Sequence, residues 1–125
     1  MAISSSGSSL FEVMITLVIV AILATVGYPS FSQYLRNSRR AQAQTDLLVL
    51  QLRLEEYRLN HSGESPTLAA LSADLSAYYD YQLQVSAQYY KLTATARPQS
   101  SQQQDTGCTT LMLDQWRQRN PATCW

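Results

Sequence analysis

The sequence predicts an α+β protein in which a long N-terminal helix packs against a small antiparallel β-sheet. Two observations point to this fold class. Over residues 30–59, apolar side chains recur at spacings of three and four, which is the period of a helix with one buried face. Over residues 78–96, apolar and polar side chains alternate in two short stretches, as they do in half-buried strands. With 125 residues, the chain has the length of one domain with a modest core.

The composition excludes several classes of function. Nine Lys and Arg balance nine Asp and Glu to a net charge of zero, which excludes a wholly basic nucleic-acid module and an acidic disordered tail. Two cysteines and one histidine, His61, would need carboxylates to complete a zinc site. The sequence has no Gly-rich phosphate loop and no GxSxG nucleophile motif. We therefore expect no enzyme activity, no cofactor and no metal, and we interpret His61 as a loop residue.

The first predicted element is an apolar helix over Leu10–Val26. As a helix this run is roughly 25 Å long, just short of a hydrocarbon core of about 30 Å. A secretory signal peptide is one interpretation, but no Lys or Arg precedes the run and no good small-x-small cleavage site follows it. A plain membrane anchor is another, and it leaves Glu12, at the start of the run, unexplained.

Glu12 is the most informative residue of this segment. A carboxylate that lies deep in a membrane costs on the order of 2–3 kcal/mol and usually has a partner. The chain offers no Lys or Arg before Arg36, roughly six helical turns further on. Cleavage after Gly7 would supply another kind of partner, because Ser8 would then carry a new N-terminal ammonium and Glu12 would be the fifth residue.

The helical pattern continues to Leu59 with one expected interruption. Gly27 and Pro29 predict a kink or a locally melted stretch near residues 25–29, or else a boundary between two helices, because proline removes a backbone donor and clashes with the preceding turn. Gly63 is expected to end the helix. The stripe expected to pack on the sheet consists of Ala43, Leu47, Leu50, Leu54 and Tyr57. A second, adjacent stripe consists of Leu48, Leu52 and Leu59.

The remaining elements are a connector, a hairpin and a third strand. We expect a connector with a short helical turn over residues 64–77, followed by two strands within residues 78–96 that are joined by a turn around Ser86–Gln88. Thr109–Asp114 is expected to be a third strand, and the Gln- and Ser-rich segment 99–104 before it a polar loop.

These motifs give the chain a resemblance to the type IV pilin family, which includes minor pilins and the pseudopilins of type II secretion. The family's processing site is a Gly, followed by a short apolar stretch with Glu as the fifth mature residue, and here Gly7 and Glu12 have that spacing. The family's proline falls on Pro29, and its aromatic pair falls on Phe31 and Tyr34.

Within that family the chain looks most like the PilE-like minor pilins. The likeness rests on Arg39-Arg40-Ala41, on the leucine-rich helix with Glu56-Tyr57, and on the ending Cys108…Cys124-Trp125. The resemblance covers nearly the whole chain and is strong from Gly7 to Tyr57.

The resemblance implies three parts. Residues 1–7 would be a prepilin leader peptide, residues 8–35 a hydrophobic N-terminal stem helix, and residues 36–125 a globular pilin head with the pilin fold. A prepilin peptidase would cut between Gly7 and Ser8 and methylate the new N-terminus of Ser8.

The resemblance also implies partners, a location and two assembly residues. The chain would cross the inner membrane once before assembly and would lie in an extracellular pilus or the periplasm afterwards. Its partners would be other pilin subunits, the inner-membrane assembly platform and the prepilin peptidase. Glu12 would neutralise the new N-terminus of an adjacent subunit during docking, and Pro29 would let the stem bend or extend.

The expected function is that of a structural subunit, a minor pilin that is assembled into a type IV pilus or primes it. Three alternatives stay open. One is a DNA-uptake or adhesive minor pilin that binds a ligand through its head. The others are a type II secretion pseudopilin and an unrelated secreted protein with an unusual signal peptide.

Cys108 and Cys124 are expected to form a disulfide, since a head in the periplasm or outside the cell is in an oxidising environment. The closed loop of about 16 residues would be worth ~3 kcal/mol in the chain-entropy model. Two free thiols or a redox pair are the alternatives, although a redox pair more often has CxxC spacing. Trp116 and Trp125 flank this segment. We interpret Trp125 as a packing residue, with an adhesive contact as the alternative.

Arg36, Arg39 and Arg40 form the strongest charge cluster and share one helix face. The expected role of the cluster is an interfacial anchor or a salt-bridge face in the filament. Contact with nucleic acid is the alternative, to which Lys91 and Arg97 on one strand face would add. No aromatic residues are interleaved with the three arginines, which weakens that alternative.

Overall fold

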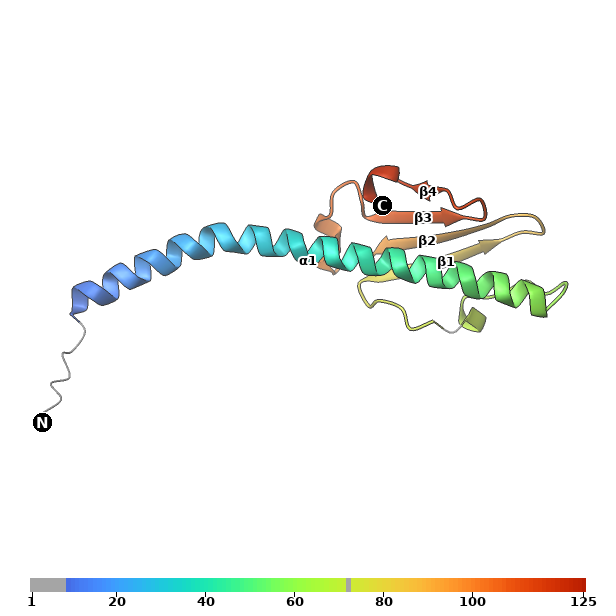
Figure 1. Ribbon diagram of the computed structural model, residues 1–125, viewed down its shortest axis with the longest axis horizontal. Coiled ribbons are helices and arrows are strands. Elements are labelled where there is room, and N and C mark those ends of the chain that lie inside the picture. The colour runs from blue at the N-terminus through green and yellow to red at the C-terminus, as the bar shows by residue number, and fades with distance from the viewer. Residues whose placement is uncertain (1–8, 72) are drawn as a thin grey trace, which may run out of the picture. The chain divides into compact units, whose positions relative to one another are not determined.

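The computed structural model describes residues 9–71 and 73–125 (Figure 1). The chain divides into two compact units, Met1–Leu35 and Arg36–Trp125, which we call the stem and the head and describe separately. In chain order, the elements are the helix α1 (Leu10–Asn60) and the strands β1 (Tyr79–Val85), β2 (Tyr90–Ala96), β3 (Thr110–Asp114) and β4 (Arg119–Asn120). Short 3₁₀ helices span Ala69–Leu71, Ser101–Gln104 and Ala122–Cys124. The predicted α+β class is confirmed.

In the stem, α1 begins at Leu10 and runs through Pro29 without a break. The melted stretch or helix boundary expected near residues 25–29 is therefore wrong. A proline inside a helix removes only one backbone donor, and the rest of the hydrogen-bond ladder can continue around it. Hydroxyl groups on either side also bond back to the helix: that of Thr25 donates to the Ile22 carbonyl at 2.7 Å, and that of Ser30 donates to the Val26 carbonyl at 3.4 Å.

In the head, α1 buries one face. Its buried residues are spaced three and four apart, as a helix that covers a sheet requires, and they are Ala43, Asp46, Leu47, Leu50 and Leu54. The predicted core stripe is thus confirmed, except that Tyr57 is only partly buried. The adjacent stripe of Leu48, Leu52 and Leu59 is exposed.

The sheet is an antiparallel meander with the strand order β1-β2-β3-β4 (Figure 1). The register places Leu83 opposite Leu92, and Leu92 opposite Leu113, so these side chains lie next to one another on the face that meets α1. The predicted hairpin and third strand are confirmed. Strand β4 was not predicted, because two residues are too few to show an alternating pattern.

A buried carboxylate ties the connector before β1 to the helix. Asp46 is 4% exposed, and it accepts hydrogen bonds from the Tyr81 hydroxyl at 2.6 Å, the Ser76 backbone N–H at 2.9 Å and the Gln42 amide at 3.0 Å. Burial and, after it, the bond to Asp46 raise the pKa of Tyr81, so the phenol stays protonated and serves as a donor. These three donors offset the cost of burying a charge.

We predict that Leu54→Ala lowers the free energy of unfolding of the head by about 3 kcal/mol, because Leu54 is fully buried and its loss leaves a cavity. Leu52→Ala is the matched control. Leu52 is 70% exposed two positions away on the same helix, so its loss should change the free energy by less than about 0.5 kcal/mol. Urea denaturation of residues 36–125, which hold the whole buried apolar cluster, measures both values. Equal losses would contradict this packing.

Candidate functional site

The first turn of α1 is capped by two side-chain acceptors, the Ser9 hydroxyl and the Glu12 carboxylate. The Ser9 hydroxyl accepts the N–H of Phe11 at 3.3 Å, and the Glu12 carboxylate accepts the N–H of Ser9 at 3.2 Å. This is a capping box, S-x-x-E, in which side chains satisfy donors that the helix leaves open. Glu12 therefore has a backbone partner in its own chain, which the search for a cationic partner missed although the motif is readable in the sequence. Gly7 and Ser8 lie outside the described residues.

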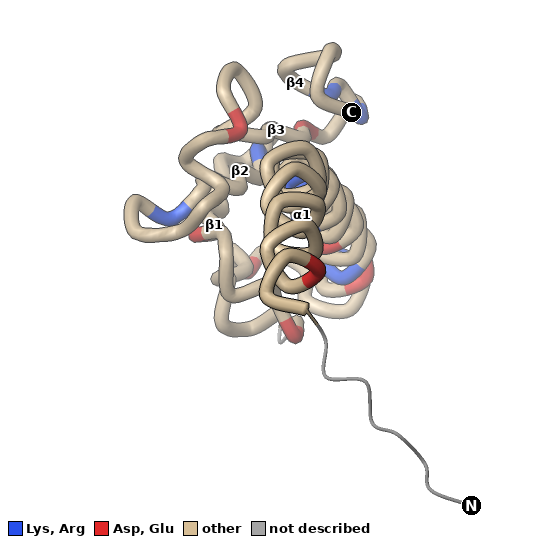
Figure 2. The backbone as a smooth tube through the Cα atoms, turned by 90° about the vertical axis from the view of Figure 1, so that its left-hand side faces the viewer, with Lys and Arg blue, Asp and Glu red and all other residues tan. Residues whose placement is uncertain are grey.

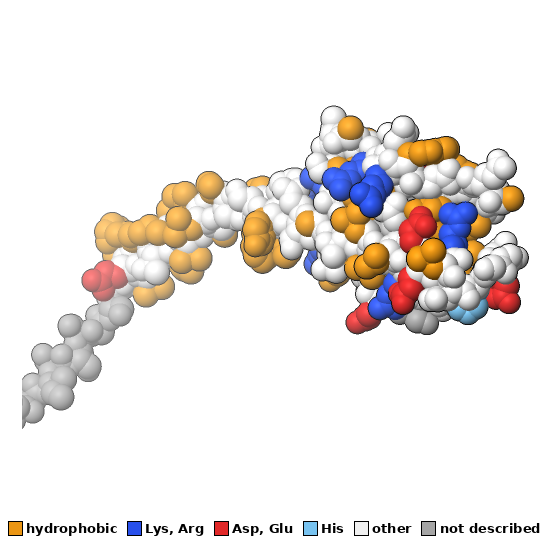
Figure 3. Space-filling view, turned by 45° about the vertical axis from the view of Figure 1, so that its right-hand side comes forward, with side chains coloured by type: hydrophobic (Ala, Val, Ile, Leu, Met, Phe, Trp, Pro, Cys, Tyr) orange, Lys and Arg blue, Asp and Glu red, His pale blue; other side chains and the backbone are white. Residues whose placement is uncertain are grey.

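The stem presents an apolar surface from Leu10 to Val26. Large apolar side chains are exposed along this length, for example Phe11 and Ile19, and Figure 3 shows them as an orange band. No charged residue lies between Glu12 and Arg36. By length and composition, α1 could cross a membrane, and it is the one described helix that could do so.

The arginines at the start of the head hold the loop between β2 and β3. Arg40 donates from one guanidinium nitrogen to both carboxylate oxygens of Asp105, at 2.9 and 3.0 Å, and Asp105 is only 5% exposed. Arg39 donates to the Ser101 hydroxyl and lies over the Tyr78 ring at 4.0 Å from its centroid. An ion pair this well covered is screened little by solvent, so Arg40 fastens the loop to α1.

Gln102, in the same loop, is fully buried. Its side-chain amide donates to the Arg36 carbonyl at 3.1 Å and to the Tyr79 hydroxyl at 2.9 Å. Burial raises the pKa of Tyr79, and the bond from Gln102 acts in the opposite direction. The segment expected to be a polar loop thus contains a 3₁₀ helix with a buried amide. The guanidinium groups of Arg39 and Arg40 are engaged within the head and do not form an open cationic face.

The predicted disulfide between Cys108 and Cys124 is confirmed, with sulfur atoms 2.03 Å apart and Cα atoms 5.6 Å apart. It joins the C-terminal segment to the chain just before β3. Gln44 of α1 donates to the Cys124 carbonyl, so the same segment is also held to the helix. Trp125 packs against the edge of the core, as expected.

The turn that joins β3 to β4 carries an exposed tryptophan, Trp116. The Asp114 carboxylate accepts the backbone N–H of Trp116 at 3.0 Å and that of Gln118 at 2.9 Å. Between them Arg117 has a φ of 59°, a left-handed conformation that is unusual for a residue with a Cβ. The carboxylate satisfies the inner donors of the turn, so the side chains can point outward. Trp116 is 64% exposed.

Aromatic rings and cations lie close together around this turn. The rings of Trp116 and Tyr89 lie 5.9 Å apart, and Arg119 lies 5.3 Å from the centroid of the Trp125 ring. Lys91 pairs in register with Asp114, at the start of the turn. Arg119 pairs with Leu113 and shares its face, so Lys91 projects from the opposite face of the sheet. We call Tyr89, Trp116, Arg117 and Arg119 the turn surface. Figure 2 shows basic positions at β4 near the C-terminus.

The turn surface combines the groups that single-stranded nucleic-acid sites use, aromatic faces for bases and cations for phosphates. Sequence reasoning missed it, although the run Gln115-Trp116-Arg117-Gln118-Arg119 contains the signal. In the sequence this run lies 26 residues or more from Tyr89, and only the folded sheet brings the Tyr89 ring beside Trp116.

A groove of about 380 Å³ lies between α1 and this turn. Its lining residues are Leu48, Gln51, Leu52, Glu55, Tyr90, Gln115, Arg117 and Arg119. The Tyr90 hydroxyl donates to Glu55 at 2.8 Å and accepts from the Gln51 amide at 3.0 Å. Burial raises the pKa of Tyr90, and the bond from Gln51 works against this shift. The phenol therefore stays neutral and can hold Glu55 in place.

The other candidate residues lie apart from the turn surface. Arg97 makes an ion pair with Asp80 at 2.9 Å, and both side chains are at least half exposed. His61, next to the end of α1, stacks on Tyr57 with ring centroids 4.1 Å apart. In the part of the chain that the structure describes, no three His, Cys, Asp or Glu side chains are grouped so that they could hold a metal ion.

Comparison with known families gives one match. The family model described as "Type IV minor pilin ComP, DNA uptake sequence receptor" matches residues 29–112, more than half of the chain. No curated protein matches the chain. The matched range starts at Pro29 and includes the three arginines of the head as well as β1 and β2. It ends within β3, before Trp116 and Cys124.

Proposed function

The chain belongs to the type IV minor pilin family ComP, and on this premise we propose that it is assembled into, or primes, a type IV pilus and binds DNA through the turn surface of its head. The matching family is described as a DNA uptake sequence receptor, which favours DNA over the adhesive and secretion alternatives. The observation that carries the choice of site is the exposed Trp116, next to Arg117 on a turn held by Asp114.

In this proposal the stem serves assembly. The precursor is anchored in the inner membrane by its apolar helix, a prepilin peptidase cuts after Gly7 and methylates Ser8, and the stem then leaves the bilayer for the apolar core of the filament. Exposed apolar side chains along Leu10–Val26 support this step, because they need either lipid or other stems around them. Pro29 would let the stem bend or extend as it docks.

Glu12 would act at the moment of docking. An N-terminal ammonium buried in an apolar filament without a counter-charge is strongly destabilising. The Glu12 carboxylate accepts one backbone N–H, and a carboxylate has further lone pairs for the ammonium of an adjacent subunit. The first turn of α1 holds it at the end of the stem where that ammonium would arrive.

DNA binding is assigned to the turn surface because its groups are complementary to a nucleic acid. Arg117 and Arg119 can neutralise phosphates, and the rings of Tyr89 and Trp116 offer flat faces to bases. For Arg39 and Arg40 we propose a structural role, since each already contacts the loop between β2 and β3.

We predict that Glu12→Val leaves membrane insertion and cleavage unchanged but reduces the amount of processed protein in the sheared pilus fraction at least tenfold, because the docking ammonium would lack its counter-charge. Thr16→Val, one helical turn further on, is the control and should assemble normally. Immunoblots of membrane and pilus fractions measure both forms. Unimpaired incorporation of the Glu12 variant would count against this role.

We also predict that the full chain, purified in a non-ionic detergent, binds a mixed-sequence oligonucleotide in a salt-dependent manner. The double variant Arg117→Ala, Arg119→Ala should bind at least tenfold more weakly. The slope of log K against log salt should become shallower by about 0.9 for each lost phosphate contact. Fluorescence anisotropy with the oligonucleotide as single strand and as duplex provides the measurement.

Arg97→Ala is the control, because Arg97 is a 50% exposed arginine that lies outside the turn surface. It should change the affinity by less than about twofold. If neither form of DNA binds at low salt, or if Arg97→Ala weakens binding as much as the double variant does, the turn surface is not the DNA site.

A further inference from the structure

The groove beside the turn surface keeps opposite charges apart. Glu55 lines it from α1, while Arg117 and Arg119 line it from the turn and β4. Among the described residues, no ion pair joins Glu55 to either arginine. A groove of about 380 Å³ with a carboxylate on one wall and guanidinium groups on the other has room for a ligand that satisfies both.

The hydrogen bonds within the groove decide what each wall can offer. On the helix side, Glu55 accepts only the Tyr90 hydroxyl among the described residues, through Oε1, which leaves the lone pairs of its Oε2 as acceptors. The Gln51 amide nitrogen donates to Tyr90 and to the Asp114 carbonyl, so its own oxygen is left as an acceptor. The helix wall is therefore an acceptor wall.

The opposite wall is made of donors. The Gln115 side-chain oxygen accepts the Tyr90 backbone N–H at 3.2 Å, which leaves its amide nitrogen as a donor. Arg117 and Arg119 add guanidinium donors and are exposed. Leu48 and Leu52, 41% and 70% exposed, supply apolar contact on the helix side.

Guanine has the matching pattern. Its Watson–Crick edge carries two adjacent donors, N1–H and the N2 amino group, which one carboxylate can accept together. Its other edge carries the acceptors O6 and N7, the usual targets of arginine. Adenine, cytosine and thymine lack two adjacent donors for the carboxylate. Because pairing occupies the N1–H and N2 groups in a duplex, only an unpaired guanine can present them to Glu55.

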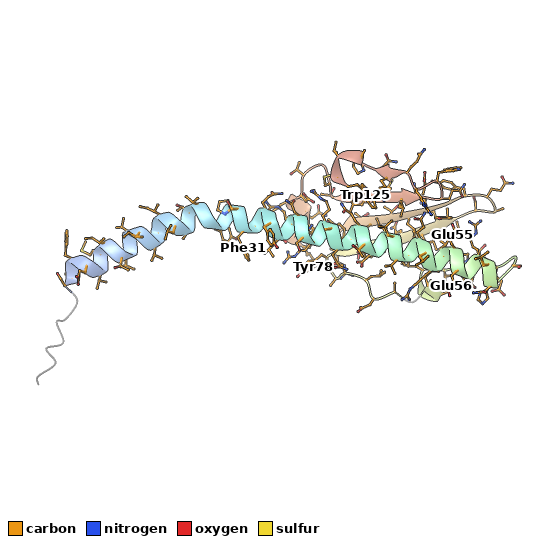
Figure 4. The ribbon with its side chains drawn as sticks, viewed as in Figure 1. Phe31, Glu55, Glu56, Tyr78 and Trp125 are labelled. Carbon is orange, nitrogen blue, oxygen red and sulfur yellow. A yellow bond between two sulfur atoms is a disulfide. The ribbon has the colours of Figure 1, made fainter. Side chains whose placement is uncertain are left out.

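Without a role in selecting a base, the carboxylate of Glu55 would be unexpected beside a surface that binds a polyanion. A carboxylate repels phosphates and weakens non-specific binding, so its position among cations favours a role in selection. Figure 4 shows Glu55 on the side of α1 toward the strands and Glu56 on the side toward the connector, and only Glu55 lines the groove. Trp116, next to Arg117 in the turn, offers a stacking face for a neighbouring base.

We propose that this groove binds an unpaired guanine of single-stranded DNA, with Glu55 accepting from its Watson–Crick edge and Arg117 or Arg119 donating to its O6 and N7. The proposal rests on the proposed DNA-binding function and adds the form of the DNA and the base that is read. It makes Glu55 the specificity-determining residue of the site.

The test uses the full chain in a non-ionic detergent and four fluorescein-labelled 15-mers of thymidine with G, A, C or T at the centre. We expect the strand with guanine to bind between about five- and 100-fold more tightly than the other three, the range for one bidentate base contact. Glu55→Gln should reduce this preference to less than about threefold and raise the affinity for the all-thymidine strand, because a carboxylate that repels phosphates is lost. A glutamine still accepts from the Tyr90 hydroxyl, so the fold is preserved.

Glu56→Gln is the matched control, because it removes the same charge one residue away and should keep the full preference for guanine. Equal affinity for the four strands, or a preference that survives Glu55→Gln, overturns the proposal. So does tighter binding of a duplex than of the strand with guanine. In those cases salt-dependent DNA binding that still requires Arg117 and Arg119 would leave the proposed function standing, whereas absence of binding to every DNA would end both.

Discussion

The packing of one face of α1 on the sheet is the interaction on which the rest of the head depends. Leu47, Leu50 and Leu54 form that face, and Leu92 and Leu113 belong to the same buried cluster. The polar residues of α1 then position each loop. Asp46 holds the connector, Arg40 holds the loop between β2 and β3, Gln44 holds the C-terminal segment, and Gln51 bonds to the start of the turn that carries Trp116. The polar residues of one regular helix thus fix the positions of loops that have little regular structure of their own.

The two halves of α1 differ in how their apolar side chains are covered. In the stem it is apolar and exposed, with Glu12 as its one charge, so it needs a partner or a membrane. In the head its apolar residues are shared between the core and the exposed stripe of Leu48 and Leu52. Assembly can therefore be assigned to the stem, while recognition is left to the surface of the head that the disulfide and the β3–β4 turn shape.

The regular elements could be predicted because their signals are local. The leucine spacing predicted the helix of the head, and alternation predicted β1, β2 and β3. The turn surface could not be assembled in this way, since Tyr89 reaches Trp116 only through strand pairing. The arginine cluster illustrates the same limit: its shared helix face was readable, but the Asp105 that pairs with Arg40 lies 65 residues further along the chain. At Pro29 local reasoning predicted a kink or a melted stretch, or else a boundary between two helices. The melted stretch and the boundary are absent, because one missing donor does not end a helix.

The most direct test of the whole account is the intact mass and N-terminal fragment spectrum of the native protein from a sheared pilus fraction. The account predicts a chain that begins at Ser8 with a methylated amino group and that has lost two hydrogens through the disulfide between Cys108 and Cys124. A chain that begins near Tyr28 would mean that a signal peptide had been removed, and it would contradict the assembly of this stem into a pilus. An intact Met1 found in membranes alone would contradict it as well.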